Sequence, residues 1–171
     1  MTRRCRVPTR LLFGYRQAEQ ITSQHGEPIT IERPDGSRLY VEVHGESNLP
    51  TLIFTHGWSM DNTGWHYAKE QLNKQFRVVW DLPGLGKSTV AASRDQSLEK
   101  MANDLEAVIE RTCQGRSVCL IGHSIGGMVI QVYARIYAET LDAKVNGIVL
   151  VNTTYKNPLT TITGRRVRSS D

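Results

Sequence analysis

The sequence lacks the features of a membrane-spanning, disulfide-rich or metal-stabilised protein. Its 171 residues contain no apolar run near the roughly 20 residues that a transmembrane helix needs. Leu11-Leu12-Phe13, after the basic start, is too short for the apolar region of a signal peptide. The three cysteines (Cys5, Cys113 and Cys119) are odd in number and lack CxxC spacing, which excludes a disulfide framework and a zinc site. We therefore expect free thiols, no metal and a cytoplasmic location, with Cys119 in the core because it lies in an apolar run.

Basic residues are also scarce in the body of the chain, although the net charge of the whole is +4. Residues 1–16 carry five arginines and no acid, and residues 156–171 carry four basic residues and one acid. Residues 17–155 hold 12 basic and 16 acidic side chains, a net charge of −4. A nucleic-acid footprint should lie on the folded body, so we expect no nucleic-acid partner. The composition instead predicts basic extensions at 1–27 and 156–171 around a core at 28–155.

Short apolar runs alternate with segments of helical character, which predicts an α/β fold. Residues 29–45 alternate apolar and polar residues on either side of Pro34-Asp35-Gly36, a pattern typical of an antiparallel hairpin. Continuous apolar runs typical of buried parallel strands follow at 51–55, 76–80, 118–121 and 147–151. Helices are expected at 61–75, 97–113 (opening on Ser97) and 126–143. The pattern predicts a mostly parallel sheet with helices on both faces and a leading antiparallel hairpin.

The pentapeptide Gly122-His123-Ser124-Ile125-Gly126 stands between an expected strand and an expected helix. In that context, Gly-x-Ser-x-Gly indicates a sharp turn that exposes a nucleophilic serine. Small residues on both sides of Ser124 allow the strand and the helix to approach, and the backbone N–H of Ile125 can face a developing oxyanion. A glycine-rich turn that binds phosphate or merely packs is the alternative for the five residues taken alone.

A second loop supports the nucleophile hypothesis. The expected strand at 51–55 runs directly into His56-Gly57-Trp58, where the N–H of Trp58 can supply a second oxyanion donor. Together with Asp81-Leu82-Pro83-Gly84-Leu85-Gly86-Lys87-Ser88 and the serine motif, in this order, the chain resembles the α/β-hydrolase fold family over about residues 28–155. The resemblance implies a serine hydrolase without metal or organic cofactor. Ser124 would be the nucleophile, and the N–H groups of Trp58 and Ile125 would form the oxyanion hole.

One motif points to a different class of protein. Gly86-Lys87-Ser88 matches the end of a phosphate-binding Walker loop, but that loop requires glycine at the position of Asp81. We therefore do not predict an ATPase. Asp81 is expected to hold the turn after its strand and not to act in acid–base chemistry.

None of the five histidines is predicted to be the general base of Ser124. A base must lie within about 3 Å of the hydroxyl, and the side chains of His123 and Ser124 are expected to diverge around so tight a turn. His56 is expected to be a structural residue of its loop. His25, His44 and His66 are expected in loops or on the surface.

The family resemblance implies that an acid and then a histidine follow the serine in the chain, and neither is found. No histidine follows His123, and Asn152-Thr153-Thr154 stand after the last expected strand where some family members carry the acid. Three acids do follow Ser124: Glu139 and Asp142 fall near the end of the helix after the serine, at the wrong edge of the sheet, and Asp171 is the final residue. We therefore expect a C-terminally shortened chain, with the strand at 147–151 as an exposed apolar edge.

The sequence thus predicts an esterase-like enzyme that hydrolyses an ester or related carbonyl small molecule by acyl transfer, with weak activity for these residues alone. A non-catalytic binding or interaction module that keeps the serine turn as architecture is the alternative. Acyl transfer to an acceptor other than water and cofactor-free peroxidase-like chemistry also fit the same turn. The oligomeric state is not predicted.

Overall fold

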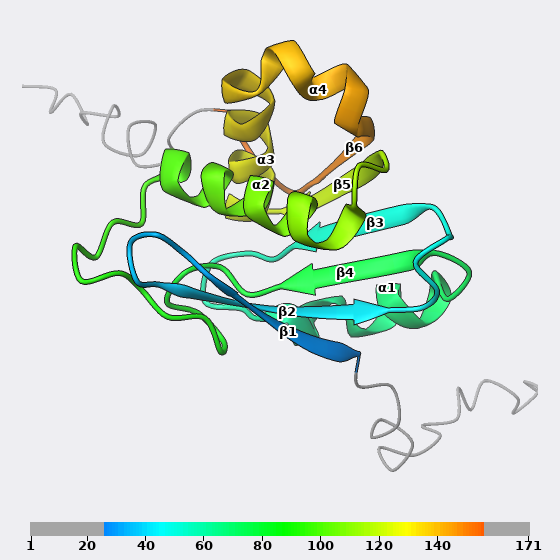
Figure 1. The fold of residues 1–171 in the computed structure, drawn as a ribbon, viewed down its shortest axis with the longest axis horizontal. Coiled ribbons are helices and arrows are strands. Elements are labelled where there is room, and N and C mark those ends of the chain that lie inside the picture. The colour runs from blue at the N-terminus through cyan, green and yellow to red at the C-terminus, as the bar shows by residue number, and fades with distance from the viewer. Residues whose placement is uncertain (1–25, 156–171) are drawn as a thin grey trace, which may run out of the picture.

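The computed structural model describes residues 26–155, which form one six-stranded sheet in the order β1-β2-β4-β3-β5-β6 (Figure 1). The pairs β1/β2 and β2/β4 are antiparallel, and β4/β3, β3/β5 and β5/β6 are parallel. The mostly parallel sheet and its leading hairpin are confirmed. The strands are β1 (Glu27–Glu32), β2 (Arg38–His44), β3 (Thr51–Thr55), β4 (Phe76–Trp80), β5 (Val118–His123) and β6 (Val145–Val151).

The helices follow the expected order but two of them are shorter than predicted. The segment at 61–75 forms η2 (Asn62–Trp65) and α1 (His66–Gln71), and then turns at Leu72 to deliver the chain to β4. The segment at 126–143 is α3 (Ile125–Ile136) and α4 (Ala138–Lys144), separated at Tyr137, whose φ of −102° and ψ of 27° leave the helical region. As predicted, α2 (Leu98–Cys113) begins at Ser97, whose side chain accepts a hydrogen bond from the N–H of Lys100. Within the described residues no helix has both the length and the apolar character to cross a membrane.

Helices cover both faces of the sheet, as the alternation of side chains along its strands requires. Ile53, Val78 and Leu120 stand in register and are fully buried in the core beneath α2 and α3. Phe54 is the next residue along β3 and so points to the opposite face. There its ring lies 5.1 Å from that of Trp65 in η2. Of the two cysteines described, Cys113 belongs to the core, whereas Cys119 is partly buried beside β6, contrary to expectation.

β6 is the edge strand beside β5, and the last four side chains of the strand are exposed. Its sequence VNGIVLV contains no charged residue, and Ile148, Val149, Leu150 and Val151 are 39–45% exposed. An uncharged, apolar strand with an unpaired row of backbone N–H and C=O groups is a template for pairing with another strand. Among residues 26–155, no strand pairs with the outer side of β6, as the sequence predicted.

We expect the chain to self-associate through β6, and Val149→Lys to reduce the association because a charge on an edge strand opposes strand pairing. Light scattering after size exclusion measures the mass. Val90→Lys is the matched control, since Val90 is 37% exposed in the loop between β4 and α2, and β4 is separated from β6 by β3 and β5. A monomeric wild-type chain, or equal effects of the two lysines, would contradict the prediction.

His44 is not the surface residue that the sequence analysis expected. It ends β2 on the α1 side of the sheet and is 7% exposed. Its Nε2 lies 3.5 Å from Glu42 Oε2 without making a hydrogen bond. Burial, with the positive charges of Lys69 and Arg77, lowers the pKa of His44 to about 4 despite the opposing effect of Glu42. His44 is therefore a neutral, buried side chain of the sheet.

This burial has a pH dependence with a defined sign. The unfolded chain binds a proton on His44 near pH 6.5 and the folded chain binds it near pH 4, so the free energy of unfolding falls as the pH drops between these values. The loss should be on the order of 2–3 kcal/mol. In urea titrations, His44→Gln should flatten the profile over this range. A profile that stays as steep in His44→Gln as in the wild type would contradict the prediction.

Candidate active site

Ser124 sits on a turn so tight that its own backbone is strained. It joins β5 to α3 with φ of 53° and ψ of −120°, a left-handed conformation that non-glycine residues rarely adopt. The glycines on either side make the turn possible. A Cβ on Gly122 would lie 2.7 Å from the backbone of Gly126, and a Cβ on Gly126 would lie 2.3 Å from the carbonyl oxygen of Thr55. The strand, the helix and the end of β3 therefore meet backbone to backbone beneath the serine.

The loop after β3 is held by the fully buried His56. Its Nε2 accepts a hydrogen bond from the N–H of Leu82 at 3.0 Å, and its Nδ1 lies 2.8 Å from the carbonyl oxygen of Gly57, so that Nδ1 is the protonated nitrogen. Burial lowers the pKa of His56, with weaker opposing effects from Gly57 and Asp81. The ring is a neutral brace between two loops, which confirms the structural role that the sequence analysis assigned to it.

Asp81 closes the turn after β4, as predicted. Its Oδ1 accepts hydrogen bonds from the backbone N–H and the side-chain amide of Asn62, and its Oδ2 accepts one from the N–H of Lys87 at 2.8 Å. Its backbone oxygen accepts a hydrogen bond from the hydroxyl of Ser88. A Cβ on Gly86 would collide with this carboxylate. The residues that resemble a Walker loop thus surround a buried carboxylate, which takes the N–H of Lys87 and would repel a phosphate.

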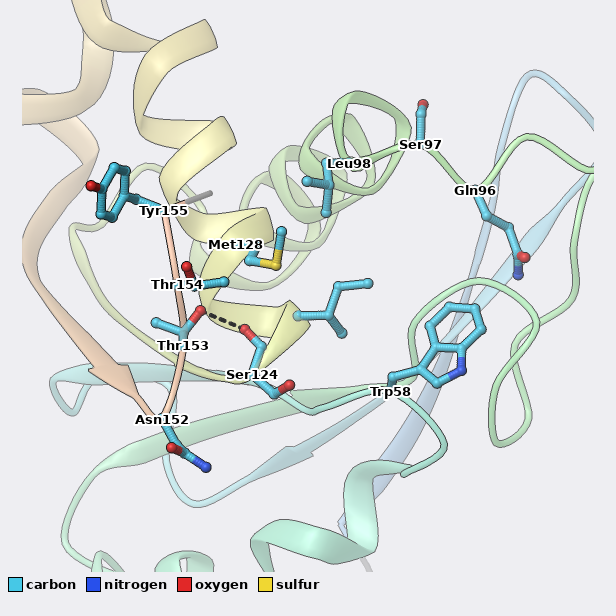
Figure 2. Close-up of a pocket in the computed structure, with 11 residues that line it drawn as sticks. Trp58, Gln96, Ser97, Leu98, Ser124, Met128, Asn152, Thr153, Thr154 and Tyr155 are labelled. Carbon is cyan, nitrogen blue, oxygen red and sulfur yellow. Dashed lines mark hydrogen bonds between the residues drawn. The ribbon is translucent and has the colours of Figure 1, made fainter. Parts of the chain in front are cut away.

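A pocket of about 790 Å³ opens beside Ser124 (Figure 2). Trp58 and Ile125, whose N–H groups were predicted to bind an oxyanion, line it together with Ser124. Within residues 26–155, neither of these N–H groups donates a hydrogen bond to a protein acceptor. The other described residues that line the pocket are Gln96, Ser97, Leu98, Met128, Asn152, Thr153, Thr154 and Tyr155, and none of the described lining residues is charged. The structure therefore brings the three predicted site residues together in one pocket.

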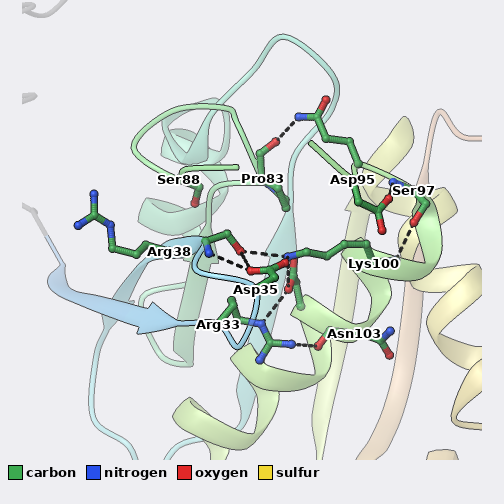
Figure 3. A network of polar contacts seen from close by, with 12 residues as sticks. Arg33, Asp35, Arg38, Pro83, Ser88, Asp95, Ser97, Lys100 and Asn103 are labelled. Carbon is green, nitrogen blue, oxygen red and sulfur yellow. Dashed lines mark hydrogen bonds and ion pairs between the residues drawn. The ribbon is translucent and has the colours of Figure 1, made fainter. Parts of the chain in front are cut away.

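One wall of this pocket is the start of α2, which a polar network ties to the β1–β2 hairpin (Figure 3). Lys100 Nζ lies 2.7 Å from Asp104 Oδ2 and 3.0 Å from Asp35 Oδ2. Arg33 Nε donates to the other oxygen of the buried Asp104 at 2.9 Å. Hydrogen bonds from Ser37 hold the pKa of Asp35 below its usual range, so the carboxylate stays ionised toward Lys100. The β1–β2 hairpin thereby holds the start of α2 in place, and with it the position of Leu98 in the pocket wall.

No histidine of the described residues stands where a base of Ser124 is needed. Both ring nitrogens of His56 are engaged, and His44 and His66 lie with the α1 side of the sheet. His123 does not line the pocket, and its Nδ1 faces Gly57, whose Cβ, if present, would lie 2.7 Å away. His25, Cys5 and Asp171 lie outside the described residues. The structure therefore brings the serine predicted as nucleophile close to the two backbone N–H groups predicted to bind an oxyanion, and no histidine among residues 26–155 lines their pocket.

Comparison with known proteins agrees with this geometry. A family model described as alpha/beta hydrolase fold matches residues 50–169. The chain belongs to this family. A pimeloyl-[acyl-carrier protein] methyl ester esterase of Aeromonas hydrophila is 33% identical over 104 residues, which are 60% of this chain and 39% of that protein. Epoxide hydrolase 4 of Homo sapiens is 28% identical over 131 residues, which are 75% of this chain and 34% of that protein.

Solved structures support the same hydrolase fold. A crystal structure from work on carboxylesterases of Nitrososphaera gargenis superposes with a TM-score of 0.69 at 22% identity. The match covers 75% of this chain and 47% of the other, and at this identity it shows the fold alone. The chain spans about two fifths of the first curated relative that it matches and about half of this structure.

Sequence reasoning found the serine turn but missed the polar residue after β6 that binds its backbone. The hydroxyl of Thr153 donates to the carbonyl oxygen of Ser124 at 2.6 Å. The sequence analysis considered the segment after 147–151 for the absent acid alone. The signal that could have found Thr153 is the parallel pairing of β5 and β6, which brings the residues just after each strand to one edge of the sheet.

Gly126→Ala should destabilise the fold by about 2–4 kcal/mol, because its Cβ would meet the carbonyl oxygen of Thr55 at 2.3 Å and that backbone cannot yield. Gly147→Ala is the control: its Cβ would lie 3.4 Å from Cys119 Sγ, an ordinary contact, and should change stability by less than about 1 kcal/mol. Urea unfolding measures both variants. Equal stabilities would show that the backbone contact beneath Ser124 is not tight.

Proposed function

We propose that this chain carries the nucleophile and the oxyanion-binding groups of an ester hydrolase. The observation that carries the proposal is the strained backbone of Ser124, which holds its hydroxyl in a pocket beside Trp58 and Ile125. Strain of about 1–3 kcal/mol in one residue persists where the surrounding structure enforces it, and such positions gather at active sites. The esterase among its relatives supports the same chemistry.

The proposed reaction is acyl transfer. Ser124 Oγ attacks the carbonyl carbon of the ester, and the N–H groups of Trp58 and Ile125 stabilise the negative charge that develops on the carbonyl oxygen. The carbon–oxygen bond to the alcohol then breaks, and the alkoxide takes up the proton that left Ser124. Water hydrolyses the acyl-serine, which releases the acid and restores the hydroxyl. A general base outside residues 26–155 carries the proton in both steps.

The pocket supports an uncharged substrate. Leu98, Met128 and the side chain of Ile125 give it an apolar wall, and Gln96 and Asn152 contribute neutral polar groups. A carboxylate or ammonium group on the substrate would lose its hydration here without gaining a charged partner from the described lining residues. We therefore propose a neutral ester of a small molecule as substrate.

We also propose a cytoplasmic location, which the free thiols of Cys113 and Cys119 support.

One of the relatives is named an epoxide hydrolase, but the serine at position 124 argues against epoxide opening by this chain. Attack by a hydroxyl on an epoxide carbon leaves an ether, which water does not cleave, so the enzyme would stop after one event. Attack on an ester leaves an acyl-serine, which water does cleave. The identity of residue 124 therefore favours an ester over an epoxide.

Labelling with a fluorophosphonate probe tests the nucleophile. We expect slow labelling of the wild-type chain that added imidazole accelerates by acting as an external base. Ser124→Ala should abolish the labelling, and Ser117→Ala, near the start of β5, should preserve it. Turnover of p-nitrophenyl esters should be weak, because loss of one member of a catalytic triad typically costs several orders of magnitude. Labelling that survives in Ser124→Ala would contradict the proposal, and a wild-type chain that stays unlabelled would favour a non-catalytic module.

A further inference from the structure

The backbone of Ser124 is tied to the segment that follows β6. Its N–H donates to the carbonyl oxygen of Val151 at 3.0 Å. Its carbonyl oxygen accepts the hydroxyl of Thr153 at 2.6 Å, in addition to the N–H groups of Gly127 at 3.0 Å and Met128 at 3.3 Å (Figure 2). The N–H and the carbonyl oxygen of the strained residue are therefore both held by β6 and the segment that follows it, which are remote from Ser124 in the sequence.

Thr153 fits this place by shape as well as by its hydroxyl. A Cβ on Gly127 would lie 2.7 Å from the Cβ, Cγ2 and Oγ1 of Thr153, so the threonine side chain packs directly against the first turn of α3. Asn152, at φ of 48°, turns the chain over the serine. Gln131 Nε2 donates to the carbonyl oxygens of Gly127 and Thr154, both at 3.1 Å, and so fastens the segment to α3.

A strained conformation needs forces that oppose its relaxation. Two of the donors to the carbonyl oxygen of Ser124, the N–H groups of Gly127 and Met128, belong to α3. These donors would move with the helix if the turn relaxed, so they do not restrain it. Thr153 belongs to the β6 side and opposes that movement. A serine hydroxyl displaced by about 1 Å loses much of its reactivity, since catalysis depends on near-attack geometry.

We propose that Thr153 is a positioning residue, whose hydroxyl holds the backbone of Ser124 in the strained conformation that presents the nucleophile. The proposal deepens the esterase function and rests on it for its chemical consequence. It makes no claim that Thr153 touches the substrate. Its structural part, the restraint on Ser124, is measurable without any turnover.

Three variants of the full chain separate the hydroxyl from general stability. Thr153→Val keeps the shape and removes the hydroxyl, and Thr153→Ser keeps the hydroxyl. Thr112→Val is the matched control, because the hydroxyl of Thr112 also donates to a backbone carbonyl, that of Val108 at 2.7 Å, at the end of α2 remote from the pocket. Amide hydrogen exchange reports the restraint, and the rate of fluorophosphonate labelling with imidazole reports the nucleophile.

We expect Thr153→Val to raise exchange at the amides of Ser124, Gly127 and Met128 about tenfold relative to amides of β4, and to slow labelling by about five- to tenfold. Thr153→Ser should keep the exchange and the labelling rate close to those of the wild type, because it keeps the hydroxyl. Thr112→Val should change neither of the two rates. Unchanged exchange in Thr153→Val, or raised exchange with an unchanged labelling rate, would overturn the positioning role. A wild-type chain that is not labelled would instead refute the esterase function, and the exchange result would still decide whether Thr153 restrains Ser124.

Discussion

The close contact of three backbones beneath Ser124 is the constraint on which the site depends. Gly126 of α3 lies against the carbonyl oxygen of Thr55 at the end of β3, and Gly122 of β5 lies against Gly126. Because β3 and β5 are parallel neighbours, this contact brings the loop after β3 and the turn after β5 to the same edge of the sheet. Any side chain at these glycines would separate the two loops, and with them Trp58 from Ser124.

Each loop at this edge is then fixed by polar groups from elsewhere in the chain. His56 and Asp81 join the loops that follow β3 and β4, and Thr153 joins the end of β6 to Ser124. Since His56 and Asp81 are fully buried, their hydrogen bonds are costly to break, and the loops keep their positions without a ligand. The site is therefore preorganised by its surroundings, which is the condition for oxyanion stabilisation by backbone N–H groups.

The parts that sequence reasoning predicted well are those with a local signal. Apolar runs located the strands, Pro34-Asp35-Gly36 located the hairpin, Ser97 located the start of α2, and the glycines around Ser124 located the turn. The failures concern residues whose environment is set by distant parts of the chain. His44 is buried because α1 and its Lys69 pack on the end of β2, and α3 stops at Tyr137, whose ring stacks on Tyr133 and whose hydroxyl donates to Asn103 of α2. No local pattern marks these contacts.

The described residues also separate two requirements of acyl transfer that one site normally combines. Stabilisation of the oxyanion depends on backbone geometry, and in the proposed function the sheet edge would supply it through the turns of Ser124 and Trp58. Proton transfer depends on a basic side chain at the hydroxyl, and among residues 26–155 no histidine, aspartate or glutamate lines the pocket. In the proposed function, the strained backbone of Ser124 can therefore promote acyl transfer only when a base from outside these residues reaches the pocket. An external base such as imidazole should therefore reveal a reactivity that is already present in the backbone.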